Sequence, residues 1–211
     1  MRRFSVLLAV LAGLAGLLAA PVAAGQPFTV VALGDSLSAG YGLGSGDGFT
    51  DRLEVRLKAD GFNVTVVNAG VSGDTTKGGL ARLDWSVPDG TSLVILELGA
   101  NDALRGIAPA ETRANLDAML AQLKQRNIPV LLAGMIAPPN MGEDYGRQFN
   151  AIYAELAQKH EVALYPFFLD GVAGEAKLNQ ADGMHPNAEG IGVIVDRIAP
   201  QVGRMLSAMK P

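Results

Sequence analysis

Short apolar segments alternate with longer segments of helical periodicity along most of the chain. Continuous apolar runs of this length, some rich in β-branched residues, are typical of buried strands. They predict five strands, at residues 28–33, 63–69, 92–99, 128–135 and 162–167. Apolar residues recurring every three or four positions predict helices at 48–61, 109–127 and 143–160, and a C-terminal helix after about residue 186. Residues 75–85 are expected to form a short helix or turn, and 168–186 a long irregular segment.

The order of these elements predicts the fold class. Strands separated by helices of this length indicate βαβ units, a parallel sheet and right-handed crossovers. Helices must then cover both faces of the sheet. We expect a three-layer α/β/α domain with about five strands, and the flavodoxin-like order 2-1-3-4-5 is the candidate topology.

Polar, glycine-rich blocks interrupt the pattern where strands end. "GDSLS" with Ser36 follows the first strand, "NAGVSGDT" with Gly73 the second, and "LGAND" with Asn101 the third. "ADGMHPNAEG", with Asp182 and His185, lies between the last strand and the last helix. Each block alone suits a helix cap or a turn. Because the carboxyl ends of parallel strands share one edge, all four blocks are expected to converge there, which favours a functional site.

The residue types in these blocks suit acyl transfer. Ser36 is the candidate nucleophile, His185 the base that takes its proton, and Asp182 the carboxylate that orients the imidazole. The backbone N–H groups of Ser36 and Gly73 and the side-chain amide of Asn101 are candidate donors to the oxyanion. The blocks therefore supply both a nucleophile system and a site for the developing negative charge.

Three further polar residues have simpler interpretations. His160 is expected to be a solvated residue near a helix C-terminus. Asp35 and Asp102 lie beside candidate site residues, but they are expected to brace their loops by accepting backbone N–H bonds, and we leave them out of the catalytic set.

The four blocks resemble those of the SGNH, or GDSL-type, hydrolases, and they occur in the same order over the predicted mature chain. "ALGDSLSAGYGL", "NAGVSGDTT", "LELGANDALRG" and "YPFFLDGV" are most similar to the periplasmic branch of the family known as thioesterase I, protease I, lysophospholipase L1 or arylesterase. The resemblance implies a flavodoxin-like sheet and hydrolysis of carboxylic esters and thioesters without a cofactor or a metal. It also assigns Ser36, Asp182 and His185 as the catalytic triad, and Ser36, Gly73 and Asn101 as the oxyanion donors. The chain lacks G-x-S-x-G because Ser38 replaces the second glycine, so the nucleophile elbow of α/β-hydrolases is not indicated.

The N-terminal segment has the pattern of a signal peptide. Arg2 and Arg3 precede an uncharged apolar run, and Val22-Ala23-Ala24 forms a small-residue cleavage site. We expect residues 1–24 to be a signal peptide for general secretion and residues 25–211 to be one hydrolase domain in the periplasm or outside the cell. An uncleaved membrane anchor is the alternative, because the run is close to the ~20 residues that span a bilayer.

Composition narrows the range of partners. Removing residues 1–24 takes the net charge from −4 to −6, because the segment contains two arginines and no acidic residue. An acidic domain is a poor candidate for binding nucleic acid or an anionic membrane surface. The absence of cysteine excludes disulfides, thiolate metal sites and a cysteine nucleophile. No obligate protein partner and no stable membrane insertion after cleavage are expected.

Substrate choice is less constrained by the sequence. Apolar residues in loops 102–110 and 137–146 suit an acyl chain or an aryl group, or else pack against the sheet: Leu104, Ile107, Pro138, Pro139 and Met141. A carbohydrate O-deacetylase is the first alternative, but only 6% of the residues are aromatic. A non-catalytic flavodoxin-like domain that binds a phosphate ligand at "GDSLSAG" is the second, and it leaves Asp182 and His185 without a role.

Overall fold

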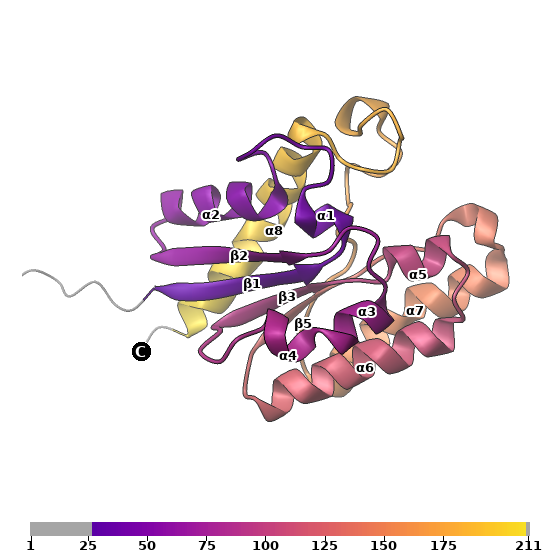
Figure 1. Cartoon of the computed structure of the whole chain (residues 1–211), viewed down its shortest axis with the longest axis horizontal. Helices are drawn as coiled ribbons and strands as arrows, with labels where there is room; N and C mark the ends of the chain where they lie inside the picture. Colours follow the sequence, from indigo (N-terminus) through magenta and orange to yellow (C-terminus); the bar gives the residue numbers. More distant parts are fainter. Residues whose placement is uncertain (1–26, 210–211) are drawn as a thin grey trace, which may run out of the picture.

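The computed structural model describes residues 27–209 and forms one α/β domain around a five-stranded parallel sheet (Figure 1). The strands are β1 (Phe28–Gly34), β2 (Val64–Gly70), β3 (Leu93–Glu97), β4 (Val130–Ala133) and β5 (Ala163–Tyr165). Their order is β2-β1-β3-β4-β5, which confirms the predicted topology. The expected signal peptide lies outside the described residues.

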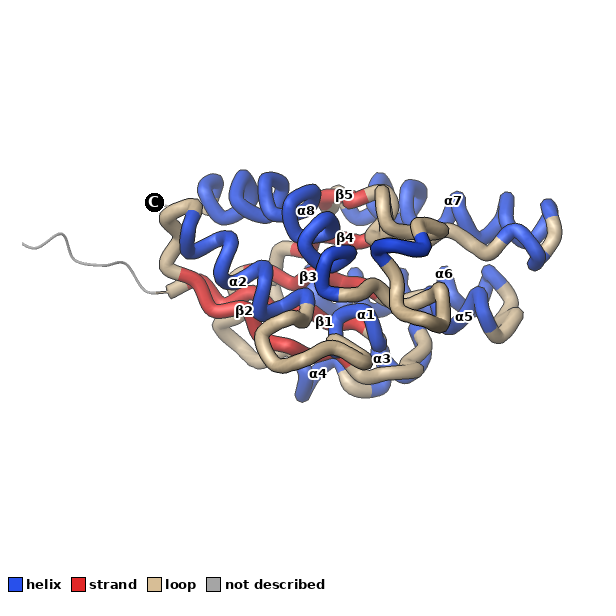
Figure 2. The backbone as a smooth tube through the Cα atoms, turned by 90° about the horizontal axis from the view of Figure 1, so that it is seen from above, coloured by secondary structure: helices blue, strands red, loops and turns tan. Residues whose placement is uncertain are grey.

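Helices cover both faces of the sheet, as the alternating pattern predicts (Figures 1 and 2). Helices α2 and α8 pack against each other on one face, and α3, α6 and α7 form a second layer on the other. The helices are α1 (Ser36–Ala39), α2 (Phe49–Ala59), α3 (Thr76–Ala81), α4 (Leu83–Ser86), α5 (Ala100–Leu104), α6 (Pro109–Gln125), α7 (Glu143–His160) and α8 (Ala188–Ala208), with short 3₁₀ turns at Pro139–Met141 and Ala176–Leu178. The long helices match the predicted ranges closely, whereas α1 and α5 were not predicted.

Burial explains the difference between central and edge strands. All five residues of β3 and the last five of β1 are buried, because helices cover both faces of these central strands. Strand β2 lies at the edge of the sheet, and there buried Val64 and Val66 alternate with exposed Thr65 and Val67. None of the helices within residues 27–209 is long and apolar enough to cross a membrane.

The five strands end in one row. Gly34 of β1 is paired in register with Gly70 of β2 and with Glu97 of β3. Glu97 is paired with Ala133 of β4, which is paired in turn with Tyr165 of β5. The loops that follow therefore all start from the same edge of the sheet, and this edge carries the candidate site.

Candidate active site

Ser36 is the first residue of α1, directly after the end of β1. The Asp35 carboxylate accepts the Leu37 N–H at 3.0 Å and so caps this short helix, and Gly40 ends it in the left-handed conformation. The turn leaves Ser36 only 9% exposed but on the wall of a cavity. The chain thus brings one hydroxyl to the carboxyl edge of the sheet.

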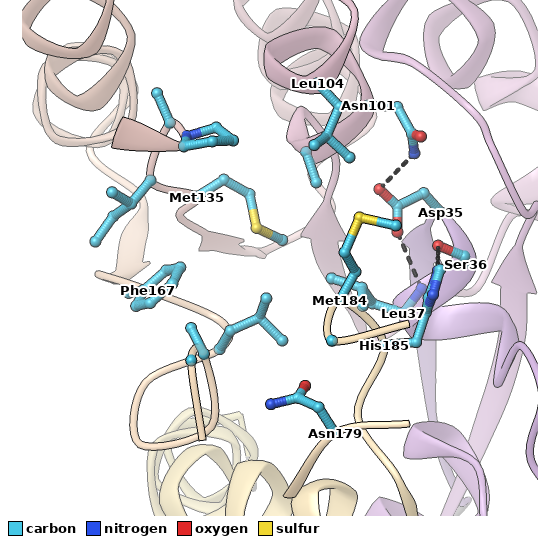
Figure 3. A pocket seen from close by; sticks show the side chains of 18 of the residues that line it. Asp35, Ser36, Leu37, Asn101, Leu104, Met135, Phe167, Asn179, Met184 and His185 are labelled. Carbon is cyan, nitrogen blue, oxygen red and sulfur yellow. Dashed lines mark hydrogen bonds between the residues drawn. The ribbon is translucent and has the colours of Figure 1, made fainter. Parts of the chain in front are cut away.

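His185 and Asp182 complete a chain of hydrogen bonds that begins at Ser36, and Figure 3 shows its first bond, between Ser36 and His185. His185 Nε2 lies 3.0 Å from Ser36 Oγ, and its Nδ1 lies 2.7 Å from Asp182 Oδ2. A carboxylate only accepts, so Nδ1 carries the proton and Nε2 is free to accept from the serine hydroxyl. This is the arrangement of nucleophile, base and orienting acid that acyl transfer needs.

The loop between Asp182 and His185 is a tight turn held by the same carboxylate. Asp182 Oδ1 accepts the N–H groups of Met184 at 2.9 Å and His185 at 3.0 Å. These two backbone bonds, together with the imidazole, lower the pKa of Asp182 from 3.8 to about 2. Asp182 therefore keeps its negative charge at neutral pH.

Two residues that the sequence analysis did not single out support the histidine. The Tyr41 ring lies against the His185 imidazole, with ring centroids 4.6 Å apart. The side-chain amide of Gln180 donates to the Tyr41 carbonyl at 2.8 Å and to the Pro186 carbonyl at 3.0 Å. Gln180 thereby ties the histidine loop to the segment after α1. The two contacts that involve Tyr41 join residues about 140 positions apart, and no local pattern predicts them.

Asn101 lies beside Ser36, as expected for an oxyanion donor. It belongs to α5, and its Nδ2 donates one hydrogen to Asp35 Oδ2 at 3.0 Å. The side chain of Asn101 makes no other hydrogen bond within residues 27–209, and it lines the same cavity as Ser36 (Figure 3). Asp35 thus braces its own helix, as expected, and also orients the amide of Asn101.

Gly73 is placed differently from Asn101, because it is not among the residues that line the cavity. It occupies the third position of a turn in which the Asp74 N–H bonds the Val71 carbonyl, and its φ of +81° requires glycine. Arg105 Nη2 donates to the Gly73 carbonyl at 2.6 Å. Since Arg105 caps the helix that carries Asn101, it connects the two candidate donors. The oxyanion role of Gly73 stays a prediction.

The other two polar residues have different outcomes. Asp102 is fully buried and accepts bonds from the Thr76 backbone and from the hydroxyls of Thr76 and Thr112, so it braces the structure as expected. His160 lies at the C-terminus of α7, as expected, but the expectation that it is solvated was wrong. Its side chain is only 9% exposed, and its Nε2 lies 2.5 Å from Asp117 Oδ1 of α6. The neighbouring helix covers this histidine, which a single helix pattern could not show.

Glu97 at the end of β3 is a buried acid beneath Ser36 that the sequence analysis also missed. It is 0% exposed, and its Oε2 accepts the Ser38 hydroxyl at 2.7 Å. Burial raises the pKa of Glu97 well above its usual range, and also raises that of Asp35 to about 6. The signal for Glu97 was present in the sequence, as one acid inside the apolar run "SLVILELG".

A cavity of 560 Å³ extends from Ser36 and is lined mainly by apolar side chains. In Figure 3, Asp35, Ser36, Asn101 and His185 lie on one side, and Met135 and Phe167 face them from the other. Of the five apolar loop residues considered from the sequence, three line the cavity (Leu104, Pro138 and Pro139) and two do not (Ile107 and Met141). Within residues 27–209 we find no group of three or more side chains able to hold a metal ion.

Comparison with known proteins agrees with this geometry. A family model described as GDSL-like lipase/acylhydrolase matches residues 32–191. Esterase TesA of Pseudomonas aeruginosa is 40% identical over 179 residues, 84% of this chain and 89% of that protein. The arylesterase of Vibrio mimicus is 39% identical over 181 residues, again 84% of this chain and 89% of that protein. The crystal structure of AlinE4, an SGNH-hydrolase family esterase, superposes with a TM-score of 0.73 at 45% identity, covering 89% of this chain and 99% of its own.

Proposed function

This chain belongs to the GDSL-like lipase/acylhydrolase family and by that membership is an ester hydrolase, and we propose that it works through an acyl-enzyme on Ser36. The observation that carries the proposal is the continuous hydrogen-bond chain from Ser36 Oγ through His185 to Asp182. A serine hydroxyl is a weak nucleophile until a base takes its proton, and here the base is already within bonding distance.

In the first half of the reaction, Ser36 Oγ attacks the acyl carbon while His185 Nε2 takes the hydroxyl proton. The carbonyl electron pair moves to the oxygen, and the charge on Asp182 stabilises the imidazolium. When the tetrahedral intermediate collapses, the bond to the leaving oxygen or sulfur breaks. His185 returns its proton to that atom, and the acyl group remains on Ser36.

In the second half, water replaces the leaving group. His185 takes a proton from the water as its oxygen attacks the acyl carbon, and the same proton returns to Ser36 Oγ when the acid departs. The oxyanion of each tetrahedral intermediate accepts hydrogen bonds from the Ser36 N–H and the Asn101 amide, with Gly73 as a third donor. One such donor contributes about 3–4 kcal/mol to the stability of the transition state.

The cavity favours substrates with an acyl chain or an aryl group, in esters or thioesters. Most of its lining residues are apolar, Phe167 among them, and Asp35, Ser36, Asn101 and His185 lie together on one side, while Asn179 lies apart from them (Figure 3). A carbohydrate substrate would gain little from such walls, because sugars need many polar partners. This arrangement, with polar groups near Ser36 and apolar walls beyond them, therefore suits an acyl group whose carbonyl lies at Ser36.

Export is a separate part of the proposal. It is supported by the charged start, apolar run and small-residue cleavage site within residues 1–24. Mass spectrometry of the protein recovered from a secreting host should find an N-terminus at Gly25. Recovery of the intact chain in the membrane fraction would instead support an anchor.

The catalytic proposal is tested by a fluorophosphonate probe together with an activity panel. Wild type should be labelled and should hydrolyse p-nitrophenyl esters and an acyl-CoA, whereas Ser36→Ala should do neither and keep its circular dichroism spectrum. Ser45→Ala, which changes an exposed serine, is the control and should behave as wild type. Equal labelling and turnover in Ser36→Ala would refute the assignment of the nucleophile.

A further inference from the structure

Glu97 is a completely buried acid with no basic partner. No arginine, lysine or histidine of the described chain bonds its carboxyl group, and Oε1 has no hydrogen-bond partner within residues 27–209. The guanidinium of Arg82 bonds the carbonyl of Gly34, which is paired with Glu97, but its carboxylate partner is Asp74 at 2.7 Å. A negative charge at Glu97 would therefore be buried without compensation.

The neighbouring groups favour an uncharged Glu97. Burying an unpaired carboxylate costs far more free energy than burying the neutral acid. Asp35, which is also buried, adds repulsion to any charge on Glu97, and Tyr153, bonded to the Leu98 carbonyl, supplies no positive charge. The 2.7 Å separation between Glu97 Oε2 and Ser38 Oγ suits a hydrogen bond in which either oxygen donates. Neutral Glu97 is thus compatible with every contact that the carboxyl group makes.

The contacts of Glu97 lie on both sides of the nucleophile. Its Oε2 accepts the N–H of Asp35, immediately before Ser36, at 3.3 Å, and the hydroxyl of Ser38, two residues after it. The approach is close because position 34 is glycine. A Cβ at Gly34 would collide with both Ser38 Oγ and the Glu97 carboxyl group. Glu97 therefore holds the start of α1 against the end of β3.

The same strand leads directly to the oxyanion donor. Asn101 follows Glu97 by four residues, and its amide is bonded to the carboxylate of Asp35. Glu97 thus contacts the segment that carries Ser36 and belongs to the segment that leads to Asn101. We propose that Glu97 is a positioning residue that fixes Ser36 relative to Asn101 by bonding Asp35 and Ser38. This inference rests on the proposed acyl transfer at Ser36.

Three variants test the proposal, each assayed for kcat, KM and melting temperature. Glu97→Met fills the space without a hydrogen-bonding oxygen, and kcat should fall roughly 10- to 100-fold, because small displacements of reacting groups have effects of this size. Glu97→Gln has the shape of a neutral glutamic acid and keeps an oxygen that can accept hydrogen bonds, so it should retain roughly a third or more of the wild-type kcat. In both variants KM should stay within about twofold of wild type, since neither change touches the cavity wall.

Ser38→Ala is the variant least able to disturb folding, since it only removes a hydroxyl. It breaks the side-chain bond to Glu97 and leaves the backbone bonds from Asp35 and Ser38, and kcat should fall about 2- to 10-fold. Thr91→Val is the matched control. It removes a buried hydroxyl that bonds the Pro88 carbonyl, at the opposite end of the sheet, and should leave kcat unchanged.

The outcomes separate this proposal from the proposed function. If Ser36→Ala is inactive while folded Glu97→Met or Ser38→Ala retains the wild-type kcat, the positioning role is overturned and the acyl transfer stands. If Glu97→Gln is as slow as Glu97→Met, the neutral acceptor role is overturned. The proposal is supported if Glu97→Met has a much lower kcat, Glu97→Gln has a kcat close to that of wild type, and KM is almost unchanged in both. A loss of packing alone would not lower kcat while leaving KM unchanged.

Discussion

Replacing Asn101 by alanine should slow catalysis and destabilise the fold through two different bonds of one amide group. One Nδ2 hydrogen is bonded to Asp35 Oδ2 at 3.0 Å, and the other is available to an oxyanion at Ser36. Asn101→Ala removes both while leaving the backbone of α5 free to form. The change therefore tests whether the amide is a catalytic donor or only a structural partner of Asp35.

The magnitudes follow from these two roles. Loss of one oxyanion donor should reduce kcat by roughly 10²- to 10³-fold, which corresponds to about 3–4 kcal/mol in the activation free energy. Asp35 is completely buried, and within residues 27–209 its carboxyl group would keep only the Leu37 N–H as a partner. Leaving part of a buried acceptor unpaired costs about 1–3 kcal/mol, and a domain of this size loses about 2–4 °C in melting temperature per kcal/mol. The expected decrease in melting temperature is therefore roughly 2–12 °C.

The assay must keep the two effects apart. Hydrolysis of a p-nitrophenyl ester should be measured well below the melting temperature of the variant, so that all of the protein is folded. KM should change little, because the oxyanion exists only after attack by Ser36. Asn115→Ala is the matched control. It removes an amide that donates to the Thr76 hydroxyl at 3.1 Å and does not line the cavity, so it should affect stability but not kcat.

Three results would each refute part of the reasoning. A kcat within tenfold of wild type in folded Asn101→Ala would show that the amide is not an oxyanion donor. A large increase in KM at unchanged kcat would show that Asn101 binds the ground state of the substrate instead. A melting temperature equal to that of wild type would refute the bracing of Asp35 without touching the catalytic role.

Three further predictions follow from the site. Asp182→Asn should lower kcat about 10³- to 10⁴-fold at every pH from about 5 to 9. The pKa of Asp182 is lowered from 3.8 to about 2, so the stabilisation that its charge provides is present above about pH 4 and is lost only as the pH falls toward 2. A decrease in kcat that varied with pH between 5 and 9 would contradict this. Arg105→Ala should reduce kcat roughly tenfold, because it removes the bond to the Gly73 carbonyl. Calorimetry should find an almost unchanged melting temperature, since this pair is exposed. An unaltered kcat would show that Arg105 does not support the oxyanion donors. Ala173→Phe should fill part of the 560 Å³ cavity and raise KM for long-chain p-nitrophenyl esters more than for the acetate, and equal effects on both would show that the acyl chain lies elsewhere.

Local patterns along the chain were sufficient for the architecture. The five strands and the long helices were predicted, because burial on both faces leaves continuous apolar runs and burial on one face leaves helical periodicity. The strand order was the candidate that the predicted fold class offers, and the structure confirms it. The last three predicted strands were too long, as for 162–167 against the three residues of β5. The apolar run extends beyond the residues that pair with a neighbouring strand, because adjacent residues are buried without taking part in the sheet.

The candidate site was accessible from the sequence for a related reason. Parallel strands all end at one edge, so the position of a residue after a strand already predicts its neighbours. This placed Ser36, Asn101, Asp182 and His185 together, and the structure joins them by hydrogen bonds or by one shared cavity. Gly73 was placed near them by the same reasoning, although it does not line the cavity.

The sequence by itself determined where the strands lie along the chain and which chemical groups follow them, because both can be read from periodicity and from position along the chain. Only the tertiary structure decided how those groups are held. The bonds from Glu97 to Ser38, from Asp35 to Asn101 and from His160 to Asp117 join residues between 43 and 66 positions apart. Such bonds depend on register and on side-chain packing between elements, and no local pattern in the chain records either.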